Sequence, residues 1–231
     1  SNLELQTFQD FEVIVVDDGS IDNTSRVMKD FMLDSQLPLC CFNQPNKGGA
    51  TARNAGIKIA KGDIIAFIDD DCIPDKHWLE YARPHFDKPD IVGVEGVILK
   101  EDKETTPTSC VTYTFKKGGY MTANMFYRKD VLQKVGGFDT QFQTFREDTD
   151  LGWRVSEHGE IVHDPYIKVM HKIIDYSVWQ FFKKHIKLRE TYFDVLLYKK
   201  HTERFMKSGE FFMGISSHVF WPYAALGVFL L

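Results

Sequence analysis

The segment EVIVVDDGS occupies residues 12–20 and joins a β-branched run to an acidic turn. Such a run predicts a buried parallel strand. The segment IIAFIDDDC at residues 64–72 repeats the arrangement, with an apolar run that ends at Asp69-Asp70-Asp71. Helical patterns follow the first strand and also begin at Gly48-Gly49. Alternating strands and helices over the first 75 residues predict an α/β fold, Rossmann-like, with a mostly parallel sheet flanked by helices.

Two acidic clusters, Asp17-Asp18 and Asp69-Asp70-Asp71, fall at the carboxyl ends of predicted strands. Open sheets of this type bind ligands at that edge. Neighbouring carboxylates repel one another unless a cation or hydrogen-bond donors compensate. Carboxylate oxygens suit Mg²⁺ or Mn²⁺ on a substrate phosphate. We therefore expect Asp69-x-Asp71 to hold a divalent cation on a diphosphate, and the alternative is a solvated acidic turn that caps the next helix.

Two cations stand near a predicted helix N-terminus, where free N–H groups favour an anion. They are Lys47 and Arg53, which would contact a phosphate or the aspartate clusters. A surface position or a structural ion pair explains each of them equally well. Asp17 or Asp18 would accept hydrogen bonds from a nucleobase or ribose, unless the pair only forms a turn.

A third acidic group, Glu147-Asp148-x-Asp150, begins a predicted helix at residues 147–158. Carboxylates there stabilise a helix through its dipole. One of them could instead deprotonate an attacking hydroxyl as a general base. His171 follows a predicted strand at residues 162–170 and is either structural or a third metal ligand.

The composition is that of a globular protein, with 43% hydrophobic and 26% charged residues among 231. The net charge of −5 makes no overall case for nucleic-acid binding. That charge divides into −10 over residues 1–167 and +5 over residues 168–231, which points to an anionic surface as partner of the C-terminal part. The four cysteines lack a zinc spacing and suggest reduced thiols in the cytoplasm.

The C-terminal part contains a long amphipathic segment over residues 176–199. Residues 176–207 mix aromatic and basic side chains, so they would lie on an anionic membrane face or pack on the catalytic domain. The uncharged run at residues 219–231 is too short to span a bilayer. It is either the start of a membrane helix or a buried C-terminal helix. We expect a cytoplasmic protein at the inner face of the membrane.

Four blocks in this order resemble the family 2 glycosyltransferases of the GT-A fold. They are EVIVVDDGSIDNT (residues 12–24), NKGGATARNAGIKIAKGDIIAFIDDDCIPD (46–75), VGGFDTQF (135–142) and REDTDLGWR (146–154). The resemblance extends over residues 5–175. It implies a catalytic domain at residues 1–175, followed by an amphipathic helix and apolar tail at residues 176–231.

The resemblance also implies roles for individual residues. Asp18 resembles the nucleobase-contacting aspartate, with Asp17 beside it. Asp69-Asp70-Asp71 resembles the DxD element, in which Asp70 lies near the ribose and Asp71 ligates the cation on the diphosphate. Asp148 resembles the general base, with Glu147 and Asp150 as fallback assignments. His171 matches a histidine near the diphosphate or the metal.

The reaction implied is a metal-dependent, inverting sugar transfer, of the kind used in polysaccharide biosynthesis. The donor is a nucleotide sugar, with UDP favoured by family habit, and the acceptor is a hydroxyl of a saccharide or lipid-linked molecule. Two departures stand out: the family's first strand is missing, so that residues 3–11 would be the end of the helix after it, and Cys72 replaces a common aspartate. The rival interpretations are a sugar-1-phosphate nucleotidyltransferase and a catalytically degenerate binding domain.

Overall fold

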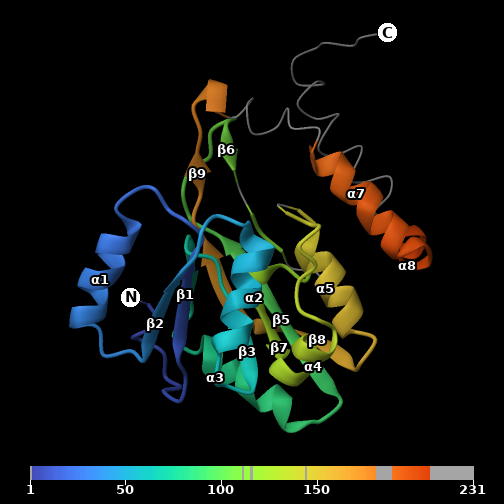
Figure 1. Ribbon diagram of the computed structural model, residues 1–231, viewed down its shortest axis with the longest axis horizontal. Coiled ribbons are helices and arrows are strands. Elements are labelled where there is room, and N and C mark those ends of the chain that lie inside the picture. Colours follow the sequence, from blue (N-terminus) through green and yellow to red (C-terminus); the bar gives the residue numbers. More distant parts are fainter. Residues whose placement is uncertain (1, 111, 115–116, 144, 181–188, 209–231) are drawn as a thin grey trace. The chain divides into compact units, whose positions relative to one another are not determined.

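The computed structural model describes residues 2–110, 112–114, 117–143, 145–180 and 189–208 (Figure 1). The chain divides into two compact units, Ser1–Asp175 and Tyr176–Leu231. The two units are described separately below. Their predicted roles, as a catalytic domain and an appended segment, remain predictions.

Strands and helices alternate along the first part of unit 1 as the sequence predicts. The order is β1 (Val13–Asp17), α1 (Thr24–Asp34), β2 (Leu39–Asn43), α2 (Gly49–Ile59) and β3 (Ile64–Phe67). β1 and β2 pair in parallel, with Val13 opposite Leu39 and Asp17 opposite Asn43. The acidic clusters therefore follow the carboxyl ends of β1 and β3, as expected.

The second part of unit 1 departs from simple alternation. Its elements are β4 (Cys72–Pro74), α3 (Trp78–Ala82), η1 (Arg83–Asp87), β5 (Ile91–Lys100), β6 (Ser109–Cys110), η2 (Thr122–Asn124), β7 (Met125–Arg128), α4 (Lys129–Lys134), α5 (Glu147–Val155), β8 (Glu160–His171) and β9 (Ile174–Asp175). The helix expected to begin at Pro74 begins at Trp78, because Pro74 belongs to the short strand β4.

The larger sheet has five strands in the order β3-β7-β5-β8-β4. Only β5 and β8 are parallel within it, and the other three pairs are antiparallel. The α/β class is confirmed, but the expected mostly parallel sheet is wrong in this respect, because the sheet is mixed. Apolar runs predict a buried strand without revealing its direction, and β7 runs against both of its neighbours.

Each face of this sheet is covered by helices. On one face the α3–η1 region packs against the strands in a core of Trp78, Ala82, Phe86, Ile91, Val94, Phe126, Ile167 and Val169. Trp78 Nε1 donates to Asn124 Oδ1 at 2.8 Å, which ties α3 to η2. The other face carries α2 and α5 (Figure 1). There the Phe67 ring meets Phe138 and Tyr127 edge-on, with centroids 5.4 and 6.3 Å away.

The N-terminal residues form a turn rather than the expected end of a helix. Leu5 N donates to Asn2 O at 3.3 Å, and Gln6 Nε2 reaches Asp75 O at 2.8 Å, so this segment docks beside α3. Among the described residues β1 pairs only with β2, and β3 only with β7. Each strand thus has one open edge, and the missing first strand remains a prediction.

Unit 2 contains α7 (Arg189–Lys200) and α8 (Thr202–Ser208) in its described part. Phe193, Leu197 and Phe205 are buried. Of the predicted long amphipathic segment, residues 181–188 lie outside the described residues, and so does the apolar run at 219–231. In the part of the chain that the structure describes, every helix is too short or too polar to cross a bilayer. The four cysteines are free thiols, as expected.

Candidate active site

Asp18 lies just beyond β1 and ties that strand to the start of α2. Its carboxylate accepts hydrogen bonds from the backbone N–H of Lys47 at 2.9 Å, the N–H of Gly48 at 2.7 Å and the Gln44 amide at 2.7 Å. Burial acts to raise the pKa of Asp18, but these donors outweigh it and lower the pKa. Asp18 is therefore ionised at neutral pH and is fixed beside the N-terminus of α2.

Asp17 points into the protein instead. Its side chain accepts hydrogen bonds from Ser20 N at 2.8 Å and Ser25 Oγ at 3.1 Å, and the residue is only 7% exposed. The hydrogen bonds from Ser20 lower the pKa of Asp17. Asp17 thus holds the turn before α1. Its predicted contact with a nucleotide remains a prediction, and Asp18 fits that contact better.

Asp71 and His171 come together at the junction of β4 and β8, where Cys72 and His171 are register partners. His171 Nε2 lies 3.5 Å from Asp71 Oδ1, and its Nδ1 lies 2.8 Å from Lys172 O. Ligand atoms of Asp71, Cys72 and His171 all lie within 4.8 Å of one another. These three groups form the candidate metal site.

The donor chemistry of this site fits a hard divalent cation. Burial raises the pKa of the Cys72 thiol to about 12, and the charges of Asp69 and Asp71 add to the shift. Because a cysteine binds metals as the thiolate, the protonated Cys72 is a poor ligand at neutral pH. A carboxylate and an imidazole remain, and Mn²⁺ and Mg²⁺ accept such donors together with water and phosphate oxygens.

Arg53 of α2 joins two acidic segments that are far apart in the sequence. Its Nη1 lies 3.2 Å from Glu147 Oε1, and its Nη2 lies 3.7 Å from Asp69 Oδ1. The guanidinium also stands over the Phe138 ring, 5.6 Å from its centroid. Burial raises the pKa of Asp69, and the charge of Arg53 opposes that rise. Asp69, Arg53 and Glu147 therefore form one ion-paired cluster at the predicted site.

Asp148 sits beside that cluster in the first turn of α5. Its carboxylate is half-buried and accepts a 2.7 Å hydrogen bond from Thr149 N. Burial raises the pKa of Asp148 to about 7, and the negative charge of Glu147 adds to the effect. Arg53 and Arg146 oppose the rise. A carboxylate with this pKa is suited to accept a proton near neutral pH.

The two fallback bases are less suitable. Asp150 is 1% exposed and is held by Arg154 at 2.6 and 2.9 Å. Glu147 is engaged by Arg53.

Lys47 is exposed near Asp18 and makes no ion pair among the described residues, so its ammonium is available to an anion. Asp70 is exposed next to the DxD carboxylates. Asp69, Arg53 and Glu147 thus meet between the end of β3, α2 and α5. Asp18 and Lys47 lie at the start of α2, and Asp71 and His171 lie at the β4–β8 junction.

A comparison with protein families settles the relationship. The model of glycosyl transferase family 2 matches residues 1–148. The chain belongs to this family. A glucosyl-dolichyl phosphate glucuronosyltransferase of Haloferax volcanii is 26% identical over 217 residues, covering 78% of this chain and 68% of the relative. A pre-mycofactocin glycosyltransferase of Mycobacterium tuberculosis is 30% identical over 183 residues, covering 69% and 37%. The chain therefore spans only about a third to two thirds of these relatives.

Solved structures show the same fold in other proteins. S. aureus TarS matches with a TM-score of 0.67 at 20% identity, covering 99% of this chain and 42% of TarS. The mannosyltransferase PcManGT from Pyrobaculum calidifontis, in complex with GDP-Man and Mn²⁺, matches with a TM-score of 0.62 at 17% identity, covering 80% and 54%. Together with the family, these likenesses establish a GT-A fold for this family 2 glycosyltransferase.

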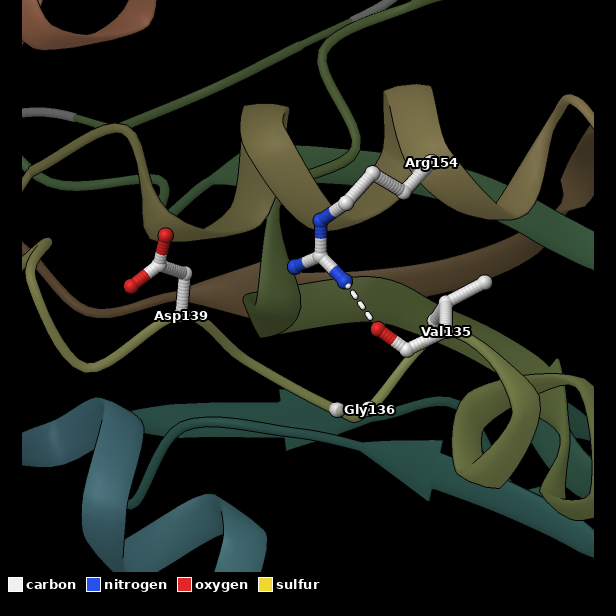
Figure 2. A pocket seen from close by; sticks show the side chains of 5 residues that line it. Val135, Gly136, Asp139 and Arg154 are labelled. Atoms are coloured by element: carbon white, nitrogen blue, oxygen red, sulfur yellow. Dashed lines mark hydrogen bonds between the residues drawn. The ribbon is translucent and has the colours of Figure 1, made fainter. Parts of the chain in front are cut away.

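A hollow of about 260 Å³ lies elsewhere in this family member, between the turn after α4 and α5 (Figure 2). Its lining is Val135, Gly136, Gly137, Asp139 and Arg154, which includes no predicted site residue. The Arg154 guanidinium donates to Val135 O at 2.8 Å as well as to Asp150. Arg154 therefore ties this turn to α5, the helix that also carries Asp148.

The structure also reveals polar residues that the motifs did not single out. Glu95 is 1% exposed in the middle of β5, where it accepts backbone N–H groups of Gly118 and Tyr120, both at 2.7 Å. His163 of β8 is opposite Glu95, and the buried Tyr127 of β7 is opposite Gly93, two residues before Glu95. A lone glutamate in the apolar run IVGVEGVILK was the available signal for this cluster.

Proposed function

We propose that this chain is the catalytic part of a metal-dependent, inverting glycosyltransferase. It moves a sugar from a nucleotide sugar, with UDP as the expected nucleotide, to a hydroxyl of a saccharide or lipid-linked acceptor. The observation that supports this proposal most is that Arg53 pairs with both Asp69 and Glu147, and Glu147 is the sequence neighbour of Asp148. A base beside a leaving-group site is the arrangement that direct displacement requires.

The donor half of the site has one role for each group. Asp18 is ionised beside the α2 N-terminus and accepts hydrogen bonds from the nucleoside. The exposed Lys47 and the helix N-terminus favour the phosphates. Asp70 would lie near the ribose. Asp71 and His171, with Asp69 close by, would hold a divalent cation, which would supply positive charge against the departing diphosphate. Arg53 links the donor half to the acceptor half through its ion pairs with Asp69 and Glu147.

The acceptor half depends on Asp148. Its carboxylate accepts the proton of the acceptor hydroxyl while that oxygen attacks the anomeric carbon. The bond from this carbon to the diphosphate oxygen breaks in the same displacement, so the configuration inverts. No enzyme nucleophile is needed, and Asp150 is unsuited to be one because Arg154 holds it in a buried ion pair.

The names of the relatives support the substrate classes. TarS has been solved in complex with UDP and with UDP-GlcNAc, and PcManGT has been solved in complex with GDP-Man and Mn²⁺. The Haloferax relative is named for a glucosyl-dolichyl phosphate, which is a lipid-linked molecule. A nucleotide-sugar donor therefore has the broader support, and a lipid-linked acceptor rests on fewer relatives.

Donor binding and turnover test the proposal together. We expect calorimetry to show UDP binding that strengthens when Mn²⁺ is present, and a panel of UDP-, GDP- and dTDP-sugars to contain a donor that is hydrolysed or transferred. Binding without turnover of any donor in the panel would leave the degenerate binding domain. Formation of a nucleotide sugar from UTP and a sugar 1-phosphate would favour the nucleotidyltransferase.

Contact with a membrane is a separate expectation, on which the inner-face location also depends. Lys199 and Lys200 end α7, and Lys207 of α8 follows the exposed apolar side chain of Met206. Basic groups near an anionic bilayer contribute about 1 kcal/mol each. We expect sedimentation with phosphatidylserine vesicles at low salt, but not with phosphatidylcholine vesicles. Charge reversal at Lys199 and Lys200 should weaken it, and equal binding to both vesicle types would contradict an electrostatic contact.

A further inference from the structure

A buried polar cluster lies on the α5 side of the sheet, outside the groups used so far. The Tyr127 hydroxyl and the Nδ1 atom of His163 are both buried, and neither has a hydrogen-bond partner among the described residues. Nδ1 lies 3.8 Å from Glu95 Oε2, beyond hydrogen-bonding distance. Buried polar groups of native proteins are paired in the great majority of cases, so an unpaired hydroxyl needs an explanation.

The strand register gathers these three side chains on one face. Glu95 of β5 is opposite His163 of β8, and Tyr127 of β7 is opposite Gly93, two residues before Glu95. The Tyr127 ring lies across Gly93, where a Cβ would be 2.9 Å from Tyr127 Cδ1. The ring therefore lies over Gly93, and its position depends on the glycine.

A second link runs from this cluster to the helix that carries Asp148. Glu95 fixes the backbone of Gly118 and Tyr120, and Tyr120 has φ 53°, an uncommon value for a residue with a side chain. The Tyr120 ring covers Gly152 so closely that a Cβ there would overlap it. Gly152 is one turn beyond Asp148 on the same face of α5. The cluster thus packs under the helix turn that presents the base.

Two carboxylates, Asp148 and Glu95, act electrostatically on the Tyr127 hydroxyl. Burial raises the pKa of Tyr127 well above its usual value, and the negative charges of Asp148 and Glu95 add to that rise. Tyr120 acts in the same direction, and Arg154 opposes it. Tyr127 therefore keeps its proton across the physiological range, and its hydroxyl can donate a hydrogen bond to a carboxylate.

Of the two carboxylates, Asp148 has more room to accept a further hydrogen bond. Glu95 accepts one backbone N–H on each oxygen, Gly118 on Oε2 and Tyr120 on Oε1. Asp148 accepts the Thr149 backbone N–H and a long 3.5 Å contact from the Thr149 hydroxyl, both on Oδ1. Among the described residues, Oδ2 of Asp148 has no donor. Catalytic hydrogen bonds are often long in the free enzyme and tighten in the substrate complex.

We propose that Tyr127 is a positioning residue for Asp148. In the substrate complex, the Asp148 carboxylate accepts a hydrogen bond from the Tyr127 hydroxyl. The hydrogen bond stabilises the ionised carboxylate and fixes which oxygen faces the acceptor hydroxyl. This inference rests on the proposed role of Asp148 as the general base. It adds a residue from the sheet that acts through Asp148 without touching the transferred sugar.

The test is Tyr127→Phe, with Tyr166→Phe as a matched control, because Tyr166 is 70% exposed. A hydrogen bond to a charged group contributes about 1.5–3 kcal/mol, so we expect roughly a tenfold or larger loss in kcat with the selected donor, at little change in KM. A donor to the ionised form lowers a pKa, so its removal should raise the pKa of Asp148 by about one unit. The acidic limb of the pH–rate profile should move upward by the same amount.

Carboxyl ¹³C NMR of Asp148 with UDP and Mn²⁺ bound measures that shift without turnover, against the surrounding charges of Glu147, Arg53 and Arg146. The melting temperature should not fall, because the removed hydroxyl has no hydrogen-bond partner among the residues that the structure describes. In an Asp148→Asn background, Tyr127→Phe should add nothing to the loss. An unchanged Asp148 titration, or a full additional loss in that background, would overturn the inference. Full activity of Asp148→Asn alone would instead remove the proposed base and this inference with it.

Discussion

Replacing Asp148 with asparagine should lower kcat by about 10²–10⁴-fold, the usual contribution of a general base, while UDP binding in the presence of Mn²⁺ stays unchanged. Asparagine has nearly the same shape but cannot accept the acceptor proton as a carboxylate does. In the unaltered protein the rate should rise with pH through about 7, where burial places the pKa of Asp148. The variant should lose that pH dependence. Steady-state rates between pH 5 and 9, with calorimetry for UDP, check both points.

Thermal stability tests the raised pKa of Asp148 independently of the rate. The pKa of Asp148 is about 7 in the fold against a usual 3.8, so ionisation is harder in the folded state. The stability that the neutral acid allows is therefore present below pH 3.8 and is lost as the pH rises through 7. Asp148→Asn should melt at a higher temperature than the unaltered protein above pH 7, and the gap should close near pH 4. Asp34→Asn, at the exposed end of α1, is the matched control and should change neither rate nor stability. Unchanged turnover of Asp148→Asn would contradict the assignment.

Much of the fold follows from the sequence because burial imposes simple periods on it. The run at residues 12–16 predicted β1, and the run at 64–68 predicted β3, each within a residue or so of its bounds. Strand direction was not predictable in the same way. β7 (Met125–Arg128) pairs antiparallel with β3 and β5 after a long connection, and no local pattern encodes that reversal. The mixed sheet is therefore a tertiary result.

The site divides along the same line. Residues next to strand ends, such as Asp18 and Asp71, were predictable because topology alone brings strand ends to one edge. The pairing of Arg53 with Glu147 was not, since it joins α2 to α5 across 94 positions. The different environments of Asp17 and Asp18 were also not predictable, because the two residues are sequence neighbours with the same charge. Only the side-chain direction distinguishes the two: successive side chains alternate at a strand end, so Asp17 faces Ser25 and Asp18 faces the α2 loop.

Glu95 and Tyr127 mark the limit of motif reasoning. Glu95 interrupts the apolar run of β5, and Tyr127 follows two apolar residues in β7. Neither belongs to a block that the family resemblance assigned a role. A charged residue in a fully buried strand is costly unless it is hydrogen-bonded. Glu95 meets that need with two backbone donors supplied by a loop more than 20 residues away. Such a residue can be singled out from sequence as an exception, but its partners come only from the structure.

The largest effect on ligand binding should come from Asp71→Ala. Asp71 Oδ1 and His171 Nε2 stand 3.5 Å apart and are the two ligand atoms left to the candidate metal site, because the raised pKa of the Cys72 thiol keeps Cys72 protonated. Loss of a partner that only supports a metal ligand already costs about 10–100-fold in affinity, so loss of the ligand itself should cost at least as much. We expect the Mn²⁺-dependent part of UDP binding to disappear in calorimetry, while the weaker metal-free binding through Asp18 remains.

Two comparisons make this result specific to the metal. Asp102→Ala removes an exposed carboxylate from the loop after β5, so it changes the net charge equally and should leave the Mn²⁺ effect intact. His171→Ala should weaken Mn²⁺ binding without abolishing it, since the carboxylate of Asp71 remains. Titrating Mn²⁺ alone by its electron paramagnetic resonance signal separates the loss of metal from the loss of nucleotide. If Asp71→Ala bound UDP with the same Mn²⁺ enhancement as the unaltered protein, the cation would have to lie elsewhere, and Asp69 beside Arg53 would be the next carboxylate to test.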